Sequence, residues 1–172
     1  MISLKKAIVT GVLILLAYIM QTTLLDEMRL ASIVPNLLLF LTFVSGFMNG
    51  RKTGMFTGFF CGLLIDIFSS SVIGLNALIY TSIGYLNGCF QALFFDEDIK
   101  LPLVLLSVSE LIYGLFTYVT RFLLNNRLNM LDYILYPIIP ELVYTIVVAV
   151  FLYRPLLKLY HWLEKGSVHV GD

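Results

Sequence analysis

Few residues in this 172-residue sequence are arranged for catalysis. Ser69, Ser70 and Ser71 form a run of hydroxyls, but no histidine lies near them in the sequence to activate a nucleophile. His161 and His169 lie near the end of the chain, without the cysteines or carboxylates that accompany histidine in metal sites. No glycine-rich loop followed by Lys-Ser or Lys-Thr is present to hold a phosphate. The sequence therefore predicts no catalytic, cofactor-binding or metal-binding residues, and no enzymatic activity.

Charged residues inside apolar segments are the next candidates for chemistry. Glu110 and Glu141 are expected near the middle of two long apolar runs, and Arg121 follows Glu110 along the first of them. This spacing keeps Glu110 and Arg121 on nearly one helix face but about 16 Å apart along it, which is too far for an ion pair. An acid at the centre of a membrane helix is a functional candidate by default. Two interpretations stay open: neutral, hydrogen-bonded structural acids, or proton sites of an ion-coupled transporter.

Two rows of residues share a four-residue spacing. The first row comprises Gly54, Gly58, Gly62 and Asp66, and the second comprises Asn76, Tyr80, Gly84 and Gly88. A hairpin turning near Ser71 would align Asp66 with Asn76, Gly62 with Tyr80, Gly58 with Gly84, and Gly54 with Gly88. Glycine rows let membrane helices approach closely, so they favour either packing within the bundle or binding of a partner helix. Because such a row drifts about 40° per step, its two ends are not expected to face one straight neighbour.

A set of polar residues is expected near one end of the helices. Pro35 is predicted at the first helical position, where its missing N–H would have had no partner. Asn36, Asp66 and Asn76 fall near the outer ends of their helices, where they would form one polar cluster. Ordinary capping is the alternative role for Asn36 and Asn76.

The composition requires a membrane to surround these residues. Hydrophobic residues make up 59% of the chain and charged residues 13%, whereas charged residues make up about 25% of an average soluble domain. Helices are the spans that lipid allows, because it offers no partner for loose backbone. We therefore predict one all-α transmembrane domain over residues 1–172. Its six helices are expected at residues 7–25, 33–49, 54–68 (unusually short), 75–95, 101–124 and 132–153.

Charge sets the orientation and excludes one class of partner. With both termini inside, eight basic residues would be cytoplasmic and three would lie outside or near the outer surface. The cytoplasmic set is Lys5, Lys6, Arg51, Lys52, Lys100, Arg154, Lys158 and Lys165, and the outer set is Arg29, Arg121 and Arg127. The formal net charge of +0 leaves no basic field for nucleic acid, so binding to nucleic acid is not expected.

At this point the sequence resembles a known family. Pro35-Asn36-Leu37-Leu38-Leu39, then Gly62-Leu63-Leu64-Ile65-Asp66, then Gly74-Leu75-Asn76-Ala77-Leu78 with Tyr80, are similar to the rod shape-determining protein MreD family. The resemblance implies a non-enzymatic scaffold in the bacterial inner membrane that maintains cell shape. It also implies association with MreC and, through that complex, with MreB, the glycosyltransferase RodA and a class B penicillin-binding transpeptidase.

Two rival functions remain open at the level of sequence. The substrate-binding membrane subunit of a vitamin importer of the energy-coupling-factor type is also small, six-helical and free of enzymatic motifs. Ala7 and Gly11 provide a small-xxx-small pair of the kind that such a subunit could use against a partner. A small ion-coupled transporter would instead use Glu110 or Glu141 as its proton site, although no inverted repeat supports it.

Overall fold

The fold of this chain is known from a computed structural model that describes residues 4–24, 34–69, 73–93, 100–125 and 138–165. All regular structure in this part of the chain is helical, which confirms the predicted all-α class. The α-helices are α1 (Leu4–Ile19), α3 (Leu37–Asn49), α4 (Arg51–Ser69), α5 (Leu75–Cys89), α6 (Lys100–Asn125) and α8 (Ile139–Lys165). A π-helical turn, Met20–Leu24, extends α1, and a 3-10 turn, Gln91–Leu93, follows α5.

The centre of the bundle is α3. Every residue from Leu37 to Met48 is buried, and α3 contacts each of the other described α-helices. A helix that is hydrophobic on all sides is stable only when neighbours cover all sides, and the run Leu37-Leu38-Leu39-Phe40-Leu41 has this character. The side chains of Phe43 and Phe47 stack with their ring centroids 5.6 Å apart, which adds a rigid layer to this core.

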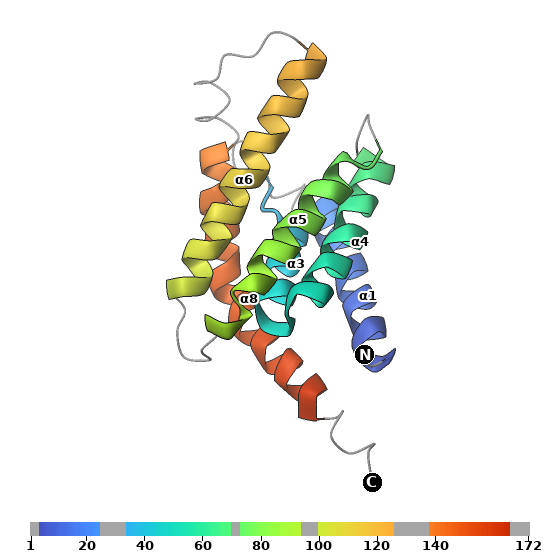
Figure 1. The fold of residues 1–172 in the computed structure, drawn as a ribbon, viewed down its shortest axis with the longest axis vertical. Coiled ribbons are helices and arrows are strands. Elements are labelled where there is room, and N and C mark those ends of the chain that lie inside the picture. Colours follow the sequence, from blue (N-terminus) through green and yellow to red (C-terminus); the bar gives the residue numbers. More distant parts are fainter. Residues whose placement is uncertain (1–3, 25–33, 70–72, 94–99, 126–137, 166–172) are drawn as a thin grey trace.

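The helices alternate in direction. Figure 1 shows α1, α4 and α6 running one way and α3, α5 and α8 running the other, so the start of α1 and the end of α8 share one end of the bundle. Gly50 makes the sharp connection between α3 and α4 with a φ of 89°, in the region that favours glycine. The closest pair of neighbours is α4 and α5, which form the antiparallel hairpin expected from the two glycine rows.

Several predicted helix boundaries were wrong. The third helix is not short, because α4 runs from Arg51 to Ser69. The last helix begins at Ile139 and continues to Lys165, with Pro155 inside it. Glu141 therefore lies in the first turn of α8. The predicted stretch of residues 132–137 lies outside the described residues.

Two further differences concern helix ends. Asn36 is the N-cap of α3, so Pro35 precedes the helix and does not occupy its first position. The asparagine side chain sets this boundary. Its oxygen accepts the backbone N–H of Leu39, which has no partner within the helix. Helix α5 ends at Cys89, and the tighter 3-10 turn Gln91–Leu93 follows it.

Among the described residues, two helices are long and apolar enough to cross a membrane. They cover Lys100–Thr120 and Ile139–Leu159, and the shorter apolar helices cover Ala7–Thr23 and Leu37–Asn49. The outer surface is also apolar. Phe60, Phe68 and Phe151 are each more than half exposed, and exposed apolar surface of this kind indicates contact with lipid or with other apolar partners.

Candidate functional site

The two glycine rows form one interface between α4 and α5. A Cβ atom at Gly62 would lie 2.5 Å from the Cα of Ala77, and one at Gly58 would lie 2.7 Å from the carbonyl carbon of Tyr80. At the other end of the interface, a Cβ at Gly84 would lie 2.5 Å from the carbonyl carbon of Gly54. Real Cβ atoms do not approach backbone this closely, so the two backbones meet only because these positions are glycine.

The register of this hairpin differs from the predicted one by about one helical turn. Gly62 faces Asn76 and Ala77, not Tyr80, while Gly58 faces Tyr80, not Gly84. In the same way Gly54 faces Gly84, and Gly88 faces Arg51. The predicted pairing of Asp66 with Asn76 is observed, because the Asp66 carboxylate reaches the backbone and side-chain N–H groups of Asn76 at the start of α5. The one-turn shift therefore concerns the glycine pairs.

Both ends of the α4 row contact α5, contrary to the expectation from the drift of such a row. Rows with a four-residue spacing are inclined to their helix axes, and the matching row on α5 is inclined as well. Two inclined rows stay in contact along their length when the helices cross at an angle. The row is thus compatible with a single neighbour, and packing within the bundle accounts for its spacing. Binding of a partner by these glycines stays a prediction.

Gly46 of α3 is a third participant that the sequence reasoning missed. A Cβ at Gly54 would lie 2.6 Å from the Cα of Gly46, and a Cβ at Gly46 would lie 3.2 Å from the backbone nitrogen of Gly88. Three backbones therefore converge where Gly46, Gly54 and Gly84 meet. The available signal was the position of Gly46 in an otherwise bulky helix, eight residues before Gly54, at the same four-residue period.

Asp66 closes the start of α5. Its side chain is buried, and one carboxylate oxygen accepts the backbone N–H groups of Gly74 and Ala77, both at 2.9 Å. The other oxygen accepts the backbone N–H of Asn76 at 3.1 Å and the side-chain amide of Asn76 at 3.0 Å. The first N–H groups of a helix have no partner within the helix, and a negative charge there is favourable. Asp66 thus acts as a capping group supplied by the neighbouring helix.

Asn36 joins this end of the bundle through Tyr80. The Asn36 side-chain oxygen accepts the Tyr80 hydroxyl at 2.8 Å, and the Asn36 backbone N–H donates to the Thr145 hydroxyl at 3.0 Å. Tyr80 is fully buried and meets the Tyr113 ring edge to face, with ring centroids 5.3 Å apart. The Tyr113 hydroxyl in turn donates to the side-chain oxygen of Asn76 at 3.4 Å. Within the predicted cluster, Asp66 and Asn76 are therefore in direct contact, and Asn36 is linked to them through the two tyrosines.

Glu110 extends the same set of contacts between α6 and α8. It is 3% exposed, its side chain is hydrogen-bonded to Thr145, and it lies near enough to Glu141 for the two carboxyl groups to interact. The Oε1 atom of Glu110 has no hydrogen-bond partner among the described residues. Glu110 is buried, whereas Glu141 is half-buried. The hydrogen bond of Glu110 with Thr145 fits the structural interpretation of this acid.

These contacts form one polar network through the middle of the protein. We define the polar network as Asn36, Asp66, Asn76, Tyr80, Glu110, Tyr113 and Thr145. It joins α3, α4, α5, α6 and α8. The sequence analysis did not identify Tyr113 and Thr145. Each follows a predicted acid by about one helical turn: Tyr113 follows Glu110, and Thr145 follows Glu141. The side chain of Arg121 lies outside the described residues.

The polar network connects the helices of the protein to one another. Its donors and acceptors mostly satisfy one another, and each such bond between membrane helices contributes about 0.6 kcal/mol on average. A helical bundle with an apolar outside and polar groups that connect its helices inside is the arrangement of an integral membrane protein. The family model described as rod shape-determining protein MreD matches residues 1–163, so the chain belongs to this family of membrane proteins.

The family match confirms the resemblance seen in the segment from Pro35 to Gly88 and extends it over nearly the whole chain. Searches of curated proteins and of solved structures returned no match. Membership supports a role in determining rod shape, and the family is one of structural proteins and not known for enzymatic activity.

Proposed function

We propose that this protein is a non-enzymatic membrane scaffold of the bacterial cell-wall elongation machinery, which maintains cell shape by associating with MreC. The observation that carries the proposal is the family match over residues 1–163. Links to MreB, RodA and a class B penicillin-binding transpeptidase would follow indirectly, through MreC. The polar network supports a scaffold because its hydrogen bonds hold the helices together.

A six-span arrangement with both termini in the cytoplasm is part of this proposal. The alternating helix directions bring the starts of α1, α4 and α6 and the end of α8 to one end of the bundle (Figure 1). Lys52 and Lys100 lie at the starts of α4 and α6, and Lys158 lies in the last part of α8. Basic residues gathered at one membrane face favour the cytoplasmic side for that face.

The proposal is tested by depletion and by copurification from native membranes. Depletion should make rod-shaped cells lose their elongated form, and the tagged protein should recover MreC when an unrelated tagged membrane protein of similar size does not. Normal shape after depletion, together with failure to recover MreC, would reject the scaffold.

The same preparation distinguishes the rival functions. A vitamin-importer subunit would bind its vitamin tightly and recover an energising ATPase module. A proton-coupled carrier would show transport that is lost when Glu110 or Glu141 is replaced by glutamine. Neither property is expected of a scaffold.

A further inference from the structure

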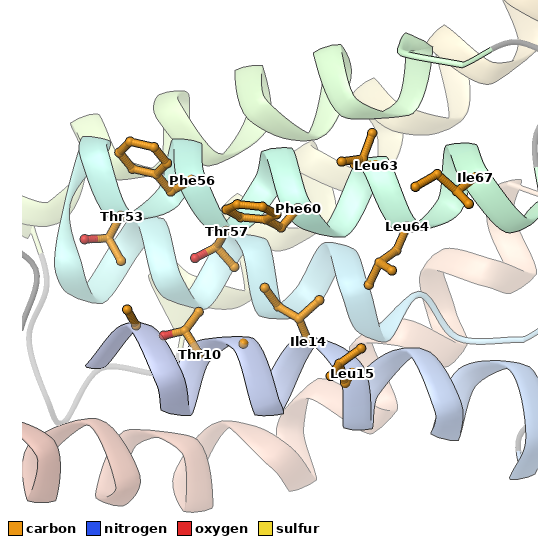
Figure 2. Close-up of a pocket in the computed structure, with 12 residues that line it drawn as sticks. Thr10, Ile14, Leu15, Thr53, Phe56, Thr57, Phe60, Leu63, Leu64 and Ile67 are labelled. Atoms are coloured by element: carbon orange, nitrogen blue, oxygen red, sulfur yellow. The ribbon is translucent and has the colours of Figure 1, made fainter. Parts of the chain in front are cut away.

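A groove between α1 and α4 is not used by the glycine interface or by the polar network. It has a volume of about 560 Å³. Figure 2 shows the side chains of α1 and α4 that face each other across it. Its lining residues are Ala7, Thr10, Gly11, Ile14 and Leu15 of α1, with Thr53, Phe56, Thr57, Phe60, Leu63, Leu64 and Ile67 of α4. No acid or base is among them, so the lining is apolar apart from three threonine hydroxyls.

The middle of this groove is open space. A Cβ atom at Gly11 would meet nothing within 4 Å among the described residues, whereas Cβ atoms at Gly54, Gly58 and Gly62 would meet backbone. The two helices run in the same direction, so Ala7 and Thr53 lie at one end of the groove and Leu15 and Ile67 at the other (Figures 1 and 2). The gap is therefore a long slot beside α4.

One end of the slot follows two basic pairs in the sequence. Each of its two helices has a basic pair directly before its first lining residue: Lys5-Lys6 before Ala7, and Arg51-Lys52 before Thr53. The Arg51 guanidinium lies 5.8 Å from the centroid of the Tyr85 ring, which holds it toward α5. Lys52 is exposed. An apolar slot with a basic end is complementary to a molecule that has an anionic head and a hydrocarbon tail.

The dimensions favour a hydrocarbon chain over a helix. From Thr53 to Ile67 the groove extends about 21 Å along α4, which exceeds the roughly 15 Å depth of one leaflet of the hydrocarbon core. A helix 10–12 Å in diameter would occupy roughly 1,600–2,400 Å³ over that length, well above the volume of the groove. The α4 side is also lined by Phe56, Phe60 and Leu64, whereas close helix pairs use small residues on both sides.

We propose that the groove between α1 and α4 binds an acyl chain of an anionic phospholipid, whose phosphate lies beside Lys52 and the start of α1. This inference goes beyond the scaffold function but rests on the cytoplasmic orientation proposed with it. Anionic lipids are a regular component of the cytoplasmic leaflet, and each basic residue near such a surface contributes about fivefold in binding. The bound lipid would hold α1 against the rest of the bundle, because α1 otherwise packs loosely on α4.

The test measures lipid binding to the full-length protein, purified in mild detergent, by native mass spectrometry during titration with phosphatidylglycerol or phosphatidylcholine. The wild type should bind phosphatidylglycerol at least fivefold more tightly than phosphatidylcholine. Gly11→Phe places a ring in the open part of the groove and should weaken binding of both lipids by about tenfold or more. Val12→Phe is the matched control, because Val12 is exposed and does not line the groove.

A second variant separates the head from the tail. Changing Lys5, Lys6 and Lys52 together to glutamine leaves the groove intact, so it should abolish the preference for phosphatidylglycerol while binding of phosphatidylcholine persists. It also keeps the proposal testable if Gly11→Phe does not fold. A photoactivatable phosphatidylglycerol should label peptides from α1 and α4 in the wild type.

Three results would overturn the proposal. These are equal affinity of the wild type for both lipids, unchanged lipid binding by Gly11→Phe, or photolabelling confined to other helices. If Gly11→Phe keeps its lipid but loses a copurifying membrane protein, the groove is a seat for a partner helix. Recovery of MreC by the wild type is scored separately, so failure of the lipid site and failure of the scaffold function give different results.

Discussion

At the scale of single residues, Asp66 is the clearest example of one side chain that organises its surroundings. Its carboxylate accepts four hydrogen bonds, three from backbone N–H groups at the start of α5 and one from the Asn76 side chain. An aspartate in an apolar helix is costly unless such donors surround it. Its burial, at 1% exposure, therefore requires the hairpin, and the hairpin in turn requires Asp66.

Replacing Asp66 by alanine should destabilise the protein and weaken its assembly with partners. Donors left without an acceptor each cost about 1–3 kcal/mol, so the free energy of unfolding should fall by at least that amount. The midpoint of thermal unfolding in detergent measures the effect. Ile67→Ala is the control, because Ile67 is the next residue of α4 and is 57% exposed.

Glu110→Gln serves as the contrasting variant in the same experiment. Glutamine keeps the shape of glutamate and an oxygen for the Thr145 hydroxyl, so the change in unfolding free energy should stay below about 1 kcal/mol. If Glu110→Gln abolished function while Asp66→Ala left it intact, a proton-coupled mechanism would replace the scaffold proposal.

At the scale of elements, the contact of α3, α4 and α5 forms the rigid part of the bundle. Glycines of all three helices meet, so the backbones approach closely and their side chains pack around the contact. This closeness depends on the absence of side chains at a few positions. In comparison, α1 faces α4 across an open groove and contributes fewer buried side chains, with Ile14 as its main core residue.

Gly58→Leu and Gly62→Leu should each separate α4 from α5 and destabilise the fold. The first Cβ would collide with the carbonyl carbon of Tyr80 and the second with the Cα of Ala77, and backbone cannot move aside as a side chain can. The expected loss exceeds the 1–3 kcal/mol that is typical of overpacking. Gly11→Leu adds the same atoms where a Cβ meets nothing within 4 Å among the described residues, so in lipid-free detergent it should leave the unfolding midpoint nearly unchanged.

Unfolding and copurification of the three variants are measured side by side. Equal stability of Gly58→Leu, Gly62→Leu and Gly11→Leu would show that the close approach of α4 and α5 is not needed for folding. Reduced recovery of MreC with an unchanged unfolding midpoint would instead indicate that the glycines contact the partner directly.

At the scale of the whole molecule, the alternation of helix directions and the distribution of basic residues make one combined prediction about orientation. The start of α4 and the end of α8 lie at the same end of the bundle (Figure 1). If that end faces the cytoplasm, the connection between α4 and α5 faces outward. An odd number of crossings would separate the two termini.

Cysteine labelling of intact and permeabilised cells checks this orientation. In a background without Cys61 and Cys89, Ser71→Cys should react with a membrane-impermeant maleimide in intact cells. Lys52→Cys and Val168→Cys should react only after the membrane is permeabilised. Labelling of Lys52→Cys and Val168→Cys from opposite sides would reject the six-span arrangement.

Composition and spacing alone determined the class of this protein, its helical segments and the pairing of α4 with α5. Apolar runs, glycine rows and the segment around Pro35-Asn36 carry that information locally, because lipid allows few structures other than helices. The family match then confirmed the resemblance that these motifs indicated. Helix ends were predicted less well, since capping by Asn36 or Asp66 depends on geometry that the apolar pattern does not encode.

Only the tertiary structure decided which polar residues meet and where space remains. The contact of Asn36 with Tyr80 and Thr145 joins residues 44 and 109 positions apart, and no local pattern predicts such a pair. The one-turn shift of the α4–α5 register is visible only in the close backbone contacts, where Gly58 faces Tyr80 and Gly54 faces Gly84. The groove beside Gly11 exists because α1 packs at a distance from α4, and that separation is set by the packing of all the helices together.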